Sequence, residues 1–405
     1  MRVLYVSQYF VSADQAGGVR HWQHTRALAR AGHHVAVVTT YVTHKERTVP
    51  ERYRGRKVVR ETDPDGLEVW RTYSTPGYGR DLRSRIASYG TFAFWSAVAG
   101  MRAARPDVIV ASSPSLPAAA AAAVIAKLRR ARFVLEVRDL WPDSAVAMGL
   151  VRDRKTIAVA RWMERFCYRR AQRIVALTEG IRDGMIALGV PPEKIELITN
   201  GIDLEIGADP TPVADPRIPD DALVAMYVGA HGTYSSLGTL LDAAERLRDL
   251  PRARIVLVGS GDQKDGLVTE AARRGLDNVL FVDPVPKREV PAWLARADIC
   301  ILPYQDRELF AGALPNKIFD YLGAARPIIA SAPRGEVTAV VEAAECGLCT
   351  PPEDGAALAD AIRSLADDAD RRAAMGERGR AWALEHYDRR ALAQRFVDTV
   401  EAVAR

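Results

Sequence analysis

The sequence predicts an α/β protein with two parallel-sheet domains. The chain has 405 residues, whereas one domain typically takes about 100–200. Short runs rich in Val, Ile and Leu alternate with helical stretches along the whole chain, and this alternation is typical of parallel sheets with crossover helices. Between Asn200 and Pro219, four prolines and several aspartates break any periodicity. We therefore expect the domain boundary in that segment.

Apolar runs bounded by turn residues predict the strands of both domains. In the first half they are Arg2 to Val6, His34 to Thr39, Asp107 to Ala111, Phe133 to Val137, Arg173 to Ala176 and Lys194 to Ile198. In the second half they are Ala222 to Val228, Arg254 to Val258, Asn278 to Val282, Asp298 to Leu302 and Pro327 to Ala330. The chain closes with an amphipathic stretch, Arg390 to Ala404, that predicts a helix.

Composition excludes several classes of protein. Four cysteines do not make a disulfide framework, and no apolar stretch reaches the ~18 residues that cross a bilayer. The net charge of +5 is not accompanied by a nucleic-acid-binding motif. Because the chain opens in an expected strand, we predict no secretory leader and a cytoplasmic protein.

Two patterns allow a metal ion, and neither is complete. Cys346 and Cys349 form a C-x-x-C pair without a second pair or a nearby histidine, so we interpret the segment as a core strand. His21 and His24 lie three residues apart on an expected helix, with no third ligand apparent. We therefore expect no metal and no other cofactor.

The segment from Phe310 to Ala330 is the most informative part of the chain. Pro315 is expected at the first position of a helix, whose unpaired amide groups attract phosphate. Lys317 adds a full charge, and Asp320 on the same face suits the two hydroxyls of a ribose. The predicted phosphate cradle consists of Gly312, Ala313, Leu314, Pro315 and Asn316. The alternative is that Lys317 and Asp320 form a solvated surface pair.

Glycine-rich loops follow three of the predicted strands. Gly17 and Gly18 would let backbone approach a diphosphate closely, with Arg20 adding charge. A similar loop follows the first predicted strand of the second half and contains Gly229, Gly232 and Ser235. Gly259-Ser-Gly261 fails the dinucleotide pattern because Lys264 occupies the sixth position. We interpret that loop as a wall of a nucleotide pocket.

Five motifs occur in an order that resembles one family. They are Gly17-Gly-Val-Arg20, Glu136-Val-Arg-Asp-Leu-Trp-Pro-Asp-Ser144, Thr199-Asn-Gly-Ile-Asp203, Gly229-Ala-His-Gly232 and Pro315-Asn-Lys-Ile-Phe-Asp-Tyr321 followed by Pro327. Nearly the whole chain is similar to the retaining glycosyltransferases of family 4, and especially to bacterial surface-polysaccharide sugar transferases. The resemblance implies the GT-B fold: two Rossmann-like domains facing a central cleft, with a C-terminal helix crossing back to the first domain.

The resemblance also implies roles for the domains and their residues. Residues 1–200 would bind the acceptor, residues 201–385 the nucleotide-sugar donor, and residues 386–405 would return to the first domain. Asp139, Arg138 and Lys317 are the expected catalytic residues, without a covalent nucleophile or a metal. The expected donor-binding residues are Gly17, Gly18, Arg20, Gly229, Gly232, Ser235, Gly312, Ala313, Leu314, Pro315, Asn316, Asp320 and Glu336.

The chain departs from the family pattern at three places. Relatives carry two glutamates where this chain has Gly312 and Asp320. They tend to have an Arg and a Lys where this chain has Ser235 and Ser236, and a histidine where it has Arg138. Lys317 must therefore hold more of the diphosphate, or Arg20 must help. Two other functions stay open, a sugar-nucleotide 2-epimerase and a non-catalytic nucleotide-sugar binding protein.

Substrates and partners are predicted only by class. The donor would carry UDP, GDP or dTDP, and the acceptor would be a glycan, a lipid-linked intermediate or a small molecule. A basic run from Arg80 leads into aromatic residues up to Trp95, which is typical of a membrane-surface element. The alternative is an ordinary helix packed on the sheet. The segments Tyr41 to Glu61 and Ser74 to Gly90 are expected to be irregular acceptor loops.

Overall fold

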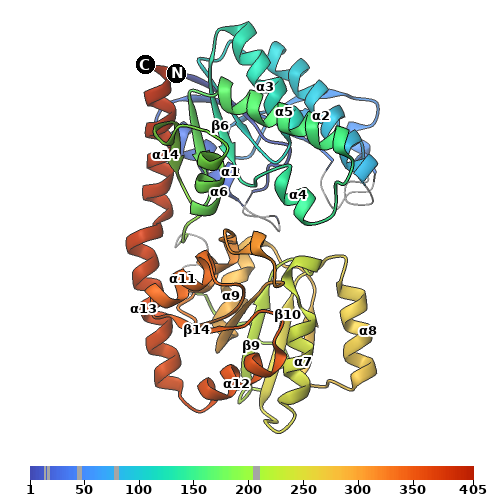
Figure 1. Cartoon of the computed structure of the whole chain (residues 1–405), viewed down its shortest axis with the longest axis vertical. Helices are drawn as coiled ribbons and strands as arrows, with labels where there is room; N and C mark the ends of the chain where they lie inside the picture. The colour runs from blue at the N-terminus through green and yellow to red at the C-terminus, as the bar shows by residue number, and fades with distance from the viewer. Residues whose placement is uncertain (13–14, 16–18, 43–47, 77–81, 204–209) are drawn as a thin grey trace. The chain divides into compact units, whose positions relative to one another are not determined.

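The computed structural model describes residues 1–12, 15, 19–42, 48–76, 82–203 and 210–405, and these form two compact units (Figure 1). The first unit contains Met1–Ser12, Val19–Thr199 and Ala391–Arg405, and the second consists mainly of Asn200–Arg390. The C-terminal return to the first unit thus begins at Ala391, five residues later than expected. The reason is that α13 (Ala369–Tyr387) belongs to the second unit, where it buries Ala383 in the core.

The first unit is built on an eight-stranded sheet in the order β3-β4-β2-β1-β5-β6-β7-β8. The strands are β1 (Arg2–Val6), β2 (His34–Thr40), β3 (Val58–Thr62), β4 (Glu68–Thr72), β5 (Val108–Ser112), β6 (Arg132–Val137), β7 (Arg173–Ala176) and β8 (Ile195–Leu197). All neighbours pair in parallel except β3, which runs antiparallel to β4. The sequence did not predict β3 and β4, because this edge hairpin mixes apolar residues with exposed charged ones.

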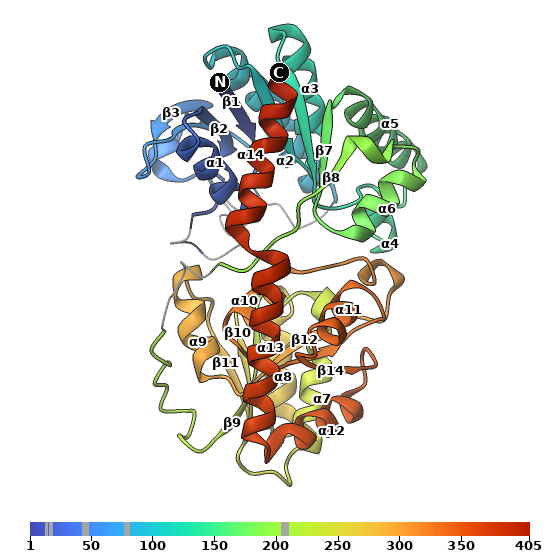
Figure 2. The same ribbon diagram turned by 90° about the vertical axis from the view of Figure 1, so that its left-hand side faces the viewer.

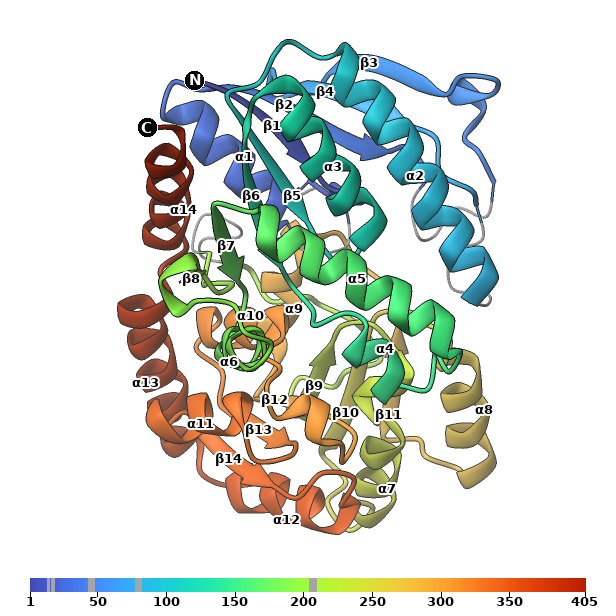
Figure 3. The ribbon, with the colours of Figure 1, turned by 45° about the horizontal axis from the view of Figure 1, so that its top comes forward.

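Helices cover both faces of this first sheet. They are α1 (Arg20–Arg30), α2 (Leu82–Arg102), α3 (Leu116–Arg129), α4 (Asp143–Ala147), α5 (Arg154–Arg170), α6 (Glu179–Ala187) and α14 (Arg389–Ala404). Figure 3 shows α2, α3 and α5 side by side, and their buried residues share one apolar cluster. Figure 2 shows α14 beside α1, where the Phe396 ring stacks on His24 with centroids 3.9 Å apart. The C-terminal helix therefore packs on the first unit, as the sequence predicted.

The second unit has a six-stranded parallel sheet in the order β11-β10-β9-β12-β13-β14. The strands are β9 (Leu223–Val228), β10 (Ala253–Val258), β11 (Val279–Val282), β12 (Ile299–Pro303), β13 (Ile328–Ser331) and β14 (Gly347–Thr350). The helices are α7 (Gly238–Arg246), α8 (Lys264–Arg274), α9 (Val290–Arg296), α10 (Asn316–Gly323), α11 (Glu336–Ala343), α12 (Gly355–Ala366) and α13. Two apolar clusters fill the two faces of the sheet. The order reverses between β9 and β12, where parallel α/β sheets usually bind ligands beyond their carboxyl ends.

Two smaller expectations have clear outcomes. The Cys346 segment does form a strand, β14, but only Cys346 is buried and Cys349 is exposed. Among the described residues, no helix combines the length and the apolar character needed to cross a membrane.

Candidate functional site

Helix α10 begins one residue later than the sequence predicted. Pro315 is the N-cap residue, with ψ at 151°, and Asn316 is the first helical residue. The apolar face of α10 buries Ile318, Phe319, Tyr321 and Leu322 in the core of the second unit. The buried hydroxyl of Tyr321 accepts a hydrogen bond of 3.0 Å from the Val228 amide. The start of α10 is thereby fixed beside the carboxyl end of β9.

Lys317, in the first turn of α10, reaches the loop that follows β9. Its Nζ lies 2.6 Å from the Tyr227 hydroxyl and 4.0 Å from the centroid of that ring. A Cβ atom on Gly229 would approach the same Nζ to 3.0 Å, so the absence of a side chain at Gly229 leaves room for the ammonium group. The structure thus brings together two residues that the sequence predicted for one site.

Tyr227 organises this corner of the sheet, and none of the sequence motifs includes it. Its hydroxyl donates to the Ala230 carbonyl at 2.7 Å, accepts from Lys317, and pairs with the Ser235 hydroxyl at 2.9 Å. These three bonds use the one donor and two acceptor positions of a phenol. The Ser235 hydroxyl is therefore bound within the loop, and the part of Ser235 in donor binding stays a prediction. A tyrosine in an apolar strand is usually a core residue, so the sequence does not indicate a role for Tyr227 in a site.

The loop after β10 packs directly against the loop after β9. A Cβ on Gly259 would lie 1.9 Å from the Gly229 carbonyl oxygen, and one on Gly261 would lie 2.3 Å from that of His231. Two glycines are therefore required for this contact. A Cβ on Gly232, which precedes the short turn Thr233–Ser235, would meet Asp262 Oδ1 at an ordinary 3.8 Å.

His231 is fully buried at this contact, and both its ring nitrogens lack a hydrogen-bond partner among the described residues. Burial and the charges of Lys264 and Lys317 lower its pKa to about 4. The ring is therefore neutral at physiological pH, and the positive charge next to Gly229 comes from the lysines.

The loop before α10 also contacts the start of α11. The Glu336 amide donates to the Ala311 carbonyl at 2.7 Å, and a Cβ on Gly335 would come within 2.1 Å of that oxygen. Glu336, the first residue of α11, thus lies beside the Gly312 loop. Two of the predicted cradle residues have other roles: the Ala313 amide donates to the Phe310 carbonyl at 3.2 Å, and Leu314 is buried in the core.

Asp320 forms an ion pair, although not with Lys317. The buried Lys287 places its Nζ 2.5 Å from Asp320 Oδ1. The expectation of a solvated Lys317–Asp320 surface pair is therefore wrong for both residues. One carboxylate oxygen of Asp320 is taken by Lys287, and the second is the one suited to a ribose hydroxyl. Lys287 is 33 residues away in the sequence, so spacing could not reveal it.

Arg138 and Asp139 follow the carboxyl end of β6 in the first unit, as predicted. Burial raises the pKa of the Asp139 carboxyl above its ordinary value. The Arg138 guanidinium donates to Nε2 of His21, and its amide donates to the Ser113 hydroxyl at 3.3 Å. Both residues are partly exposed, which leaves them accessible to a substrate.

The Arg20 side chain is held by residues of the first unit, and its predicted contact with a phosphate stays a prediction. Its Nε donates to Glu136 Oε1 at 2.7 Å, while Nη1 and Nη2 donate to the carbonyls of Thr199 and Ile198, both at 2.6 Å. The side chain is buried, so its charge serves the fold of the first unit. Gly17 and Gly18 lie outside the described residues.

His21 and His24 both approach the same buried carboxylate, Glu136. Their Nδ1 atoms lie 3.3 and 3.5 Å from its two oxygens. The guanidinium groups of Arg20 and Arg138 adjoin these residues, and their positive charge opposes a cation there. Within the described ranges, no set of three or more His, Cys, Asp or Glu side chains could hold a metal ion.

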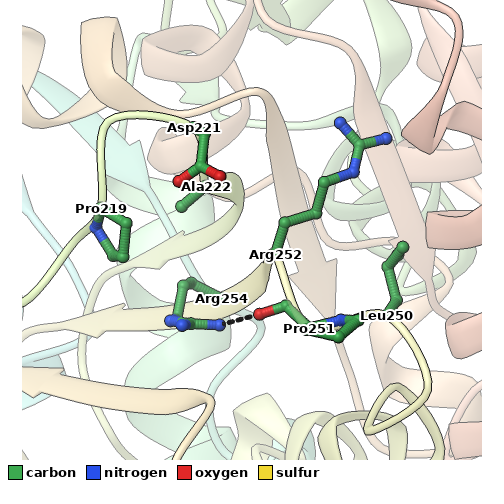
Figure 4. Close-up of a pocket in the computed structure, with 7 residues that line it drawn as sticks. All are labelled: Pro219, Asp221, Ala222, Leu250, Pro251, Arg252 and Arg254. Atoms are coloured by element: carbon green, nitrogen blue, oxygen red, sulfur yellow. Dashed lines mark hydrogen bonds between the residues drawn. The ribbon is translucent and has the colours of Figure 1, made fainter.

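A separate pocket of ≈ 350 Å³ lies at the opposite edge of the second sheet (Figure 4). Its lining residues are Pro219, Asp221, Ala222, Leu250, Pro251, Arg252 and Arg254. These residues precede or begin β9 and β10, so the pocket is at the amino ends of the strands. Ligands of parallel sheets usually bind at the carboxyl ends, and we assign no function to this pocket.

Two family descriptions match most of the chain. "Glycosyl transferase 4-like domain" matches residues 17–201, and "Glycosyl transferases group 1" matches residues 222–368. The putative colanic acid biosynthesis glycosyl transferase WcaI of Escherichia coli is 28% identical over 83% of this chain and 85% of its own. The glycogen synthase of Mycobacterium tuberculosis is 27% identical over 91% of this chain and 86% of its own.

Solved structures show the same fold. The sucrose-phosphate synthase of Thermosynechococcus elongatus superimposes with a TM-score of 0.75 at 20% identity, over 99% of this chain and 98% of its own. HepE of Anabaena, in complex with UDP and glucose, gives a TM-score of 0.72 at 17% identity, over 99% of both chains. Together with the family matches, these findings show that the chain belongs to the glycosyltransferases of family 4, which have the GT-B fold.

Proposed function

We propose that this glycosyltransferase transfers a hexosyl group from a nucleotide-diphosphate sugar to an acceptor, with retention of configuration at the anomeric carbon. The observation that carries the proposal is the position of Lys317. Its ammonium group lies against Gly229 and Tyr227, at the start of a helix and at the point where the strand order of the second sheet reverses. A helix start and a lysine at such a point suit a diphosphate.

The proposed chemistry depends on stabilising the leaving group. As the bond from the anomeric carbon to the diphosphate breaks, negative charge grows on the departing phosphate oxygens. Lys317 and the first amides of α10 stabilise that charge where it develops. Asp320 binds the ribose through the oxygen that Lys287 leaves open, with Glu336 on the neighbouring helix. No metal and no covalent nucleophile is assigned a role.

The first unit is proposed to bind the acceptor. Arg138 presents its guanidinium to the substrate that the first unit binds. Asp139 orients the acceptor hydroxyl, whose proton passes to an oxygen of the departing diphosphate as the new glycosidic bond forms. The second unit binds the donor. Because HepE is in complex with UDP and glucose, UDP-sugars are the first donors to test, before GDP- and dTDP-sugars.

The acceptor is proposed to be a glycan or a lipid-linked intermediate, since the E. coli relative is named for colanic acid biosynthesis. A surface on α2, α3 and α5 supports peripheral contact with the inner face of the plasma membrane. Phe94, Leu128 and Trp162 are 61%, 66% and 60% exposed there, and arginines and lysines occur along the same three helices. The expected alternative, a helix packed on the sheet, describes the inner face of α2, where Tyr89 and Phe92 are buried.

Vesicle co-sedimentation tests the membrane proposal. The wild type should sediment with vesicles that contain anionic lipid, and a double Phe94→Ser, Trp162→Ser variant should bind them less while keeping activity on a soluble acceptor. Equal binding of the wild type and the variant would contradict this surface assignment.

Product analysis tests the proposed reaction. A panel of nucleotide sugars is incubated with and without glycan and lipid-linked acceptors, and the products are examined by NMR. Acceptor-dependent release of nucleotide diphosphate, together with an anomeric configuration equal to that of the donor, would support the proposal. Formation of a 2-epimer without acceptor would identify the epimerase instead. Binding of a nucleotide sugar without turnover under all conditions would identify a binding protein. Family membership favours neither of these two alternatives.

A further inference from the structure

A buried hydrogen-bonded chain in the first unit connects Glu136 to Arg138. Glu136, Tyr5 and His21 are 0%, 0% and 3% exposed. The Tyr5 hydroxyl donates to Glu136 Oε2 at 3.2 Å and lies 2.9 Å from Nδ1 of His21. The other ring nitrogen of His21, Nε2, pairs with Nη1 of Arg138. The chain therefore runs from a carboxylate with no exposure to a guanidinium that is partly exposed at the end of β6.

The chemistry of the two end groups fixes every proton between them. A guanidinium has only donors, so Nε2 of His21 must carry the lone pair that accepts from Arg138. The ring is then neutral, with its proton on Nδ1. This Nδ1–H faces the Tyr5 oxygen, and the Tyr5 hydroxyl turns its own proton toward the carboxylate. Each member thus donates toward Glu136, and Arg138 donates to His21.

The charges around the chain support this arrangement. Burial lowers the pKa of His21, and the neighbouring Arg138 lowers it further. Burial opposes ionisation of Glu136, but Arg20 and the contacts with His21 hold the pKa of that carboxyl well below its ordinary value. A neutral imidazole and a charged carboxylate are what the chain of donors requires.

We propose that His21 is a positioning residue of the transferase: its Nε2 holds the Arg138 guanidinium at the end of β6, while Tyr5 and Glu136 fix the ring in the Nδ1–H tautomer. Among the described residues, His21 is the only hydrogen-bond partner of that guanidinium. Within the described part of the chain, four of its five N–H groups therefore have no protein acceptor, and these are the donors proposed for the substrate. The proposal rests on the proposed function, in which Arg138 contacts the substrate of the first unit.

Kinetics of a double-mutant cycle test this role. His21→Leu removes the acceptor and should lower kcat/KM by about 10- to 100-fold. His21→Gln keeps an acceptor near the position of Nε2 and should stay within about three-fold of the wild type, which a loss of packing would not predict. In an Arg138→Met background, His21→Leu should have almost no further effect. Melting temperatures of all variants separate these effects from unfolding.

The proposal would be overturned if His21→Leu lowered kcat/KM by the same factor in the wild type and in Arg138→Met, because His21 would then act independently of Arg138. A readout that does not depend on activity comes from ¹⁵N NMR of the histidine rings. It should show His21 protonated on Nδ1 and unprotonated on Nε2, with the Nε2 signal shifting in Arg138→Met. A charged ring, or the opposite tautomer, would overturn the proposed contact. Full activity of Arg138→Met with the expected NMR result would instead refute the role of Arg138 in the proposed function.

Discussion

Replacing Gly229 by alanine should weaken donor binding through the displacement of Lys317. The new Cβ would lie 3.0 Å from Nζ and 3.1 Å from Cε of Lys317, and 3.1 Å from the Tyr227 hydroxyl. Ordinary non-bonded contacts of carbon are about 3.5–4.0 Å, so the ammonium group must move by about half an ångström or more. A lysine side chain is flexible at its end, and it will move more easily than the backbone.

The expected loss of affinity for the diphosphate follows from the contact that the substitution removes. The 2.6 Å bond from Lys317 to Tyr227 fixes the ammonium group, and hydrogen bonds to charged groups contribute about 1.5–3 kcal/mol. Loss of one such contact to the diphosphate corresponds to about 10- to 150-fold in affinity. Calorimetry with the preferred nucleoside diphosphate measures this loss directly. The same factor is expected in kcat/KM for the nucleotide sugar.

Gly266→Ala is the matched control. A Cβ on Gly266, an exposed residue of α8, would meet nothing within 4 Å, and alanine is the better helix former by about 1 kcal/mol. This variant should bind nucleotide like the wild type and be as stable or slightly more so. The reasoning is refuted if Gly229→Ala folds normally and binds nucleotide within about two-fold of the wild type.

Three further predictions concern catalysis, pH and metals. Asp139→Asn should lose turnover while keeping donor affinity, and unchanged kcat would remove Asp139 from the mechanism. Burial raises the pKa of Glu164 to about 7 from an ordinary 4.5. At low pH the carboxyl is therefore protonated in the native state and does not lower the stability of the fold. As the pH rises from 4.5 through 7, the native state loses stability relative to the unfolded state. Between pH 4.5 and pH 8, the free energy of unfolding of Glu164→Gln should therefore rise by up to about 3 kcal/mol relative to that of the wild type. Urea unfolding at both pH values checks this, and equal changes in the two proteins would contradict it. EDTA should leave the transfer rate unchanged, whereas a loss that Mg²⁺ or Mn²⁺ restores would show a metal requirement.

The parallel strands could be predicted because strands that are buried on both faces consist of continuous apolar residues. All eleven expected strands occur, and each of their ends lies within one residue of the expected position. The hairpin of β3 and β4 was missed because each strand has only two consecutive apolar residues, Val58-Val59 and Val69-Trp70, next to charged ones, so no longer apolar run appears.

The candidate site was predictable only where its residues are close in sequence. The start of α10 follows from Pro315, Lys317 and the apolar face of the helix. The partners Tyr227 and Lys287 come from other strands and loops, and nothing local in the sequence indicates that they meet Lys317 and Asp320. The partner of Arg20 could not be predicted for the same reason, since Glu136 is 116 residues away in the sequence.

Nucleotide binding by Lys317→Met tests the central claim most directly. Methionine keeps most of the length of the side chain and removes its charge and its three N–H donors. Lys127→Met, at an exposed position of α3, controls for the change in net charge. UDP, GDP, dTDP and ADP are titrated by calorimetry into the wild type and both variants. The account predicts that the wild type prefers one nucleoside diphosphate, that Lys127→Met binds it equally well, and that Lys317→Met binds it at least about 10-fold more weakly. Equal binding by Lys317→Met would contradict the placement of the donor diphosphate at the start of α10.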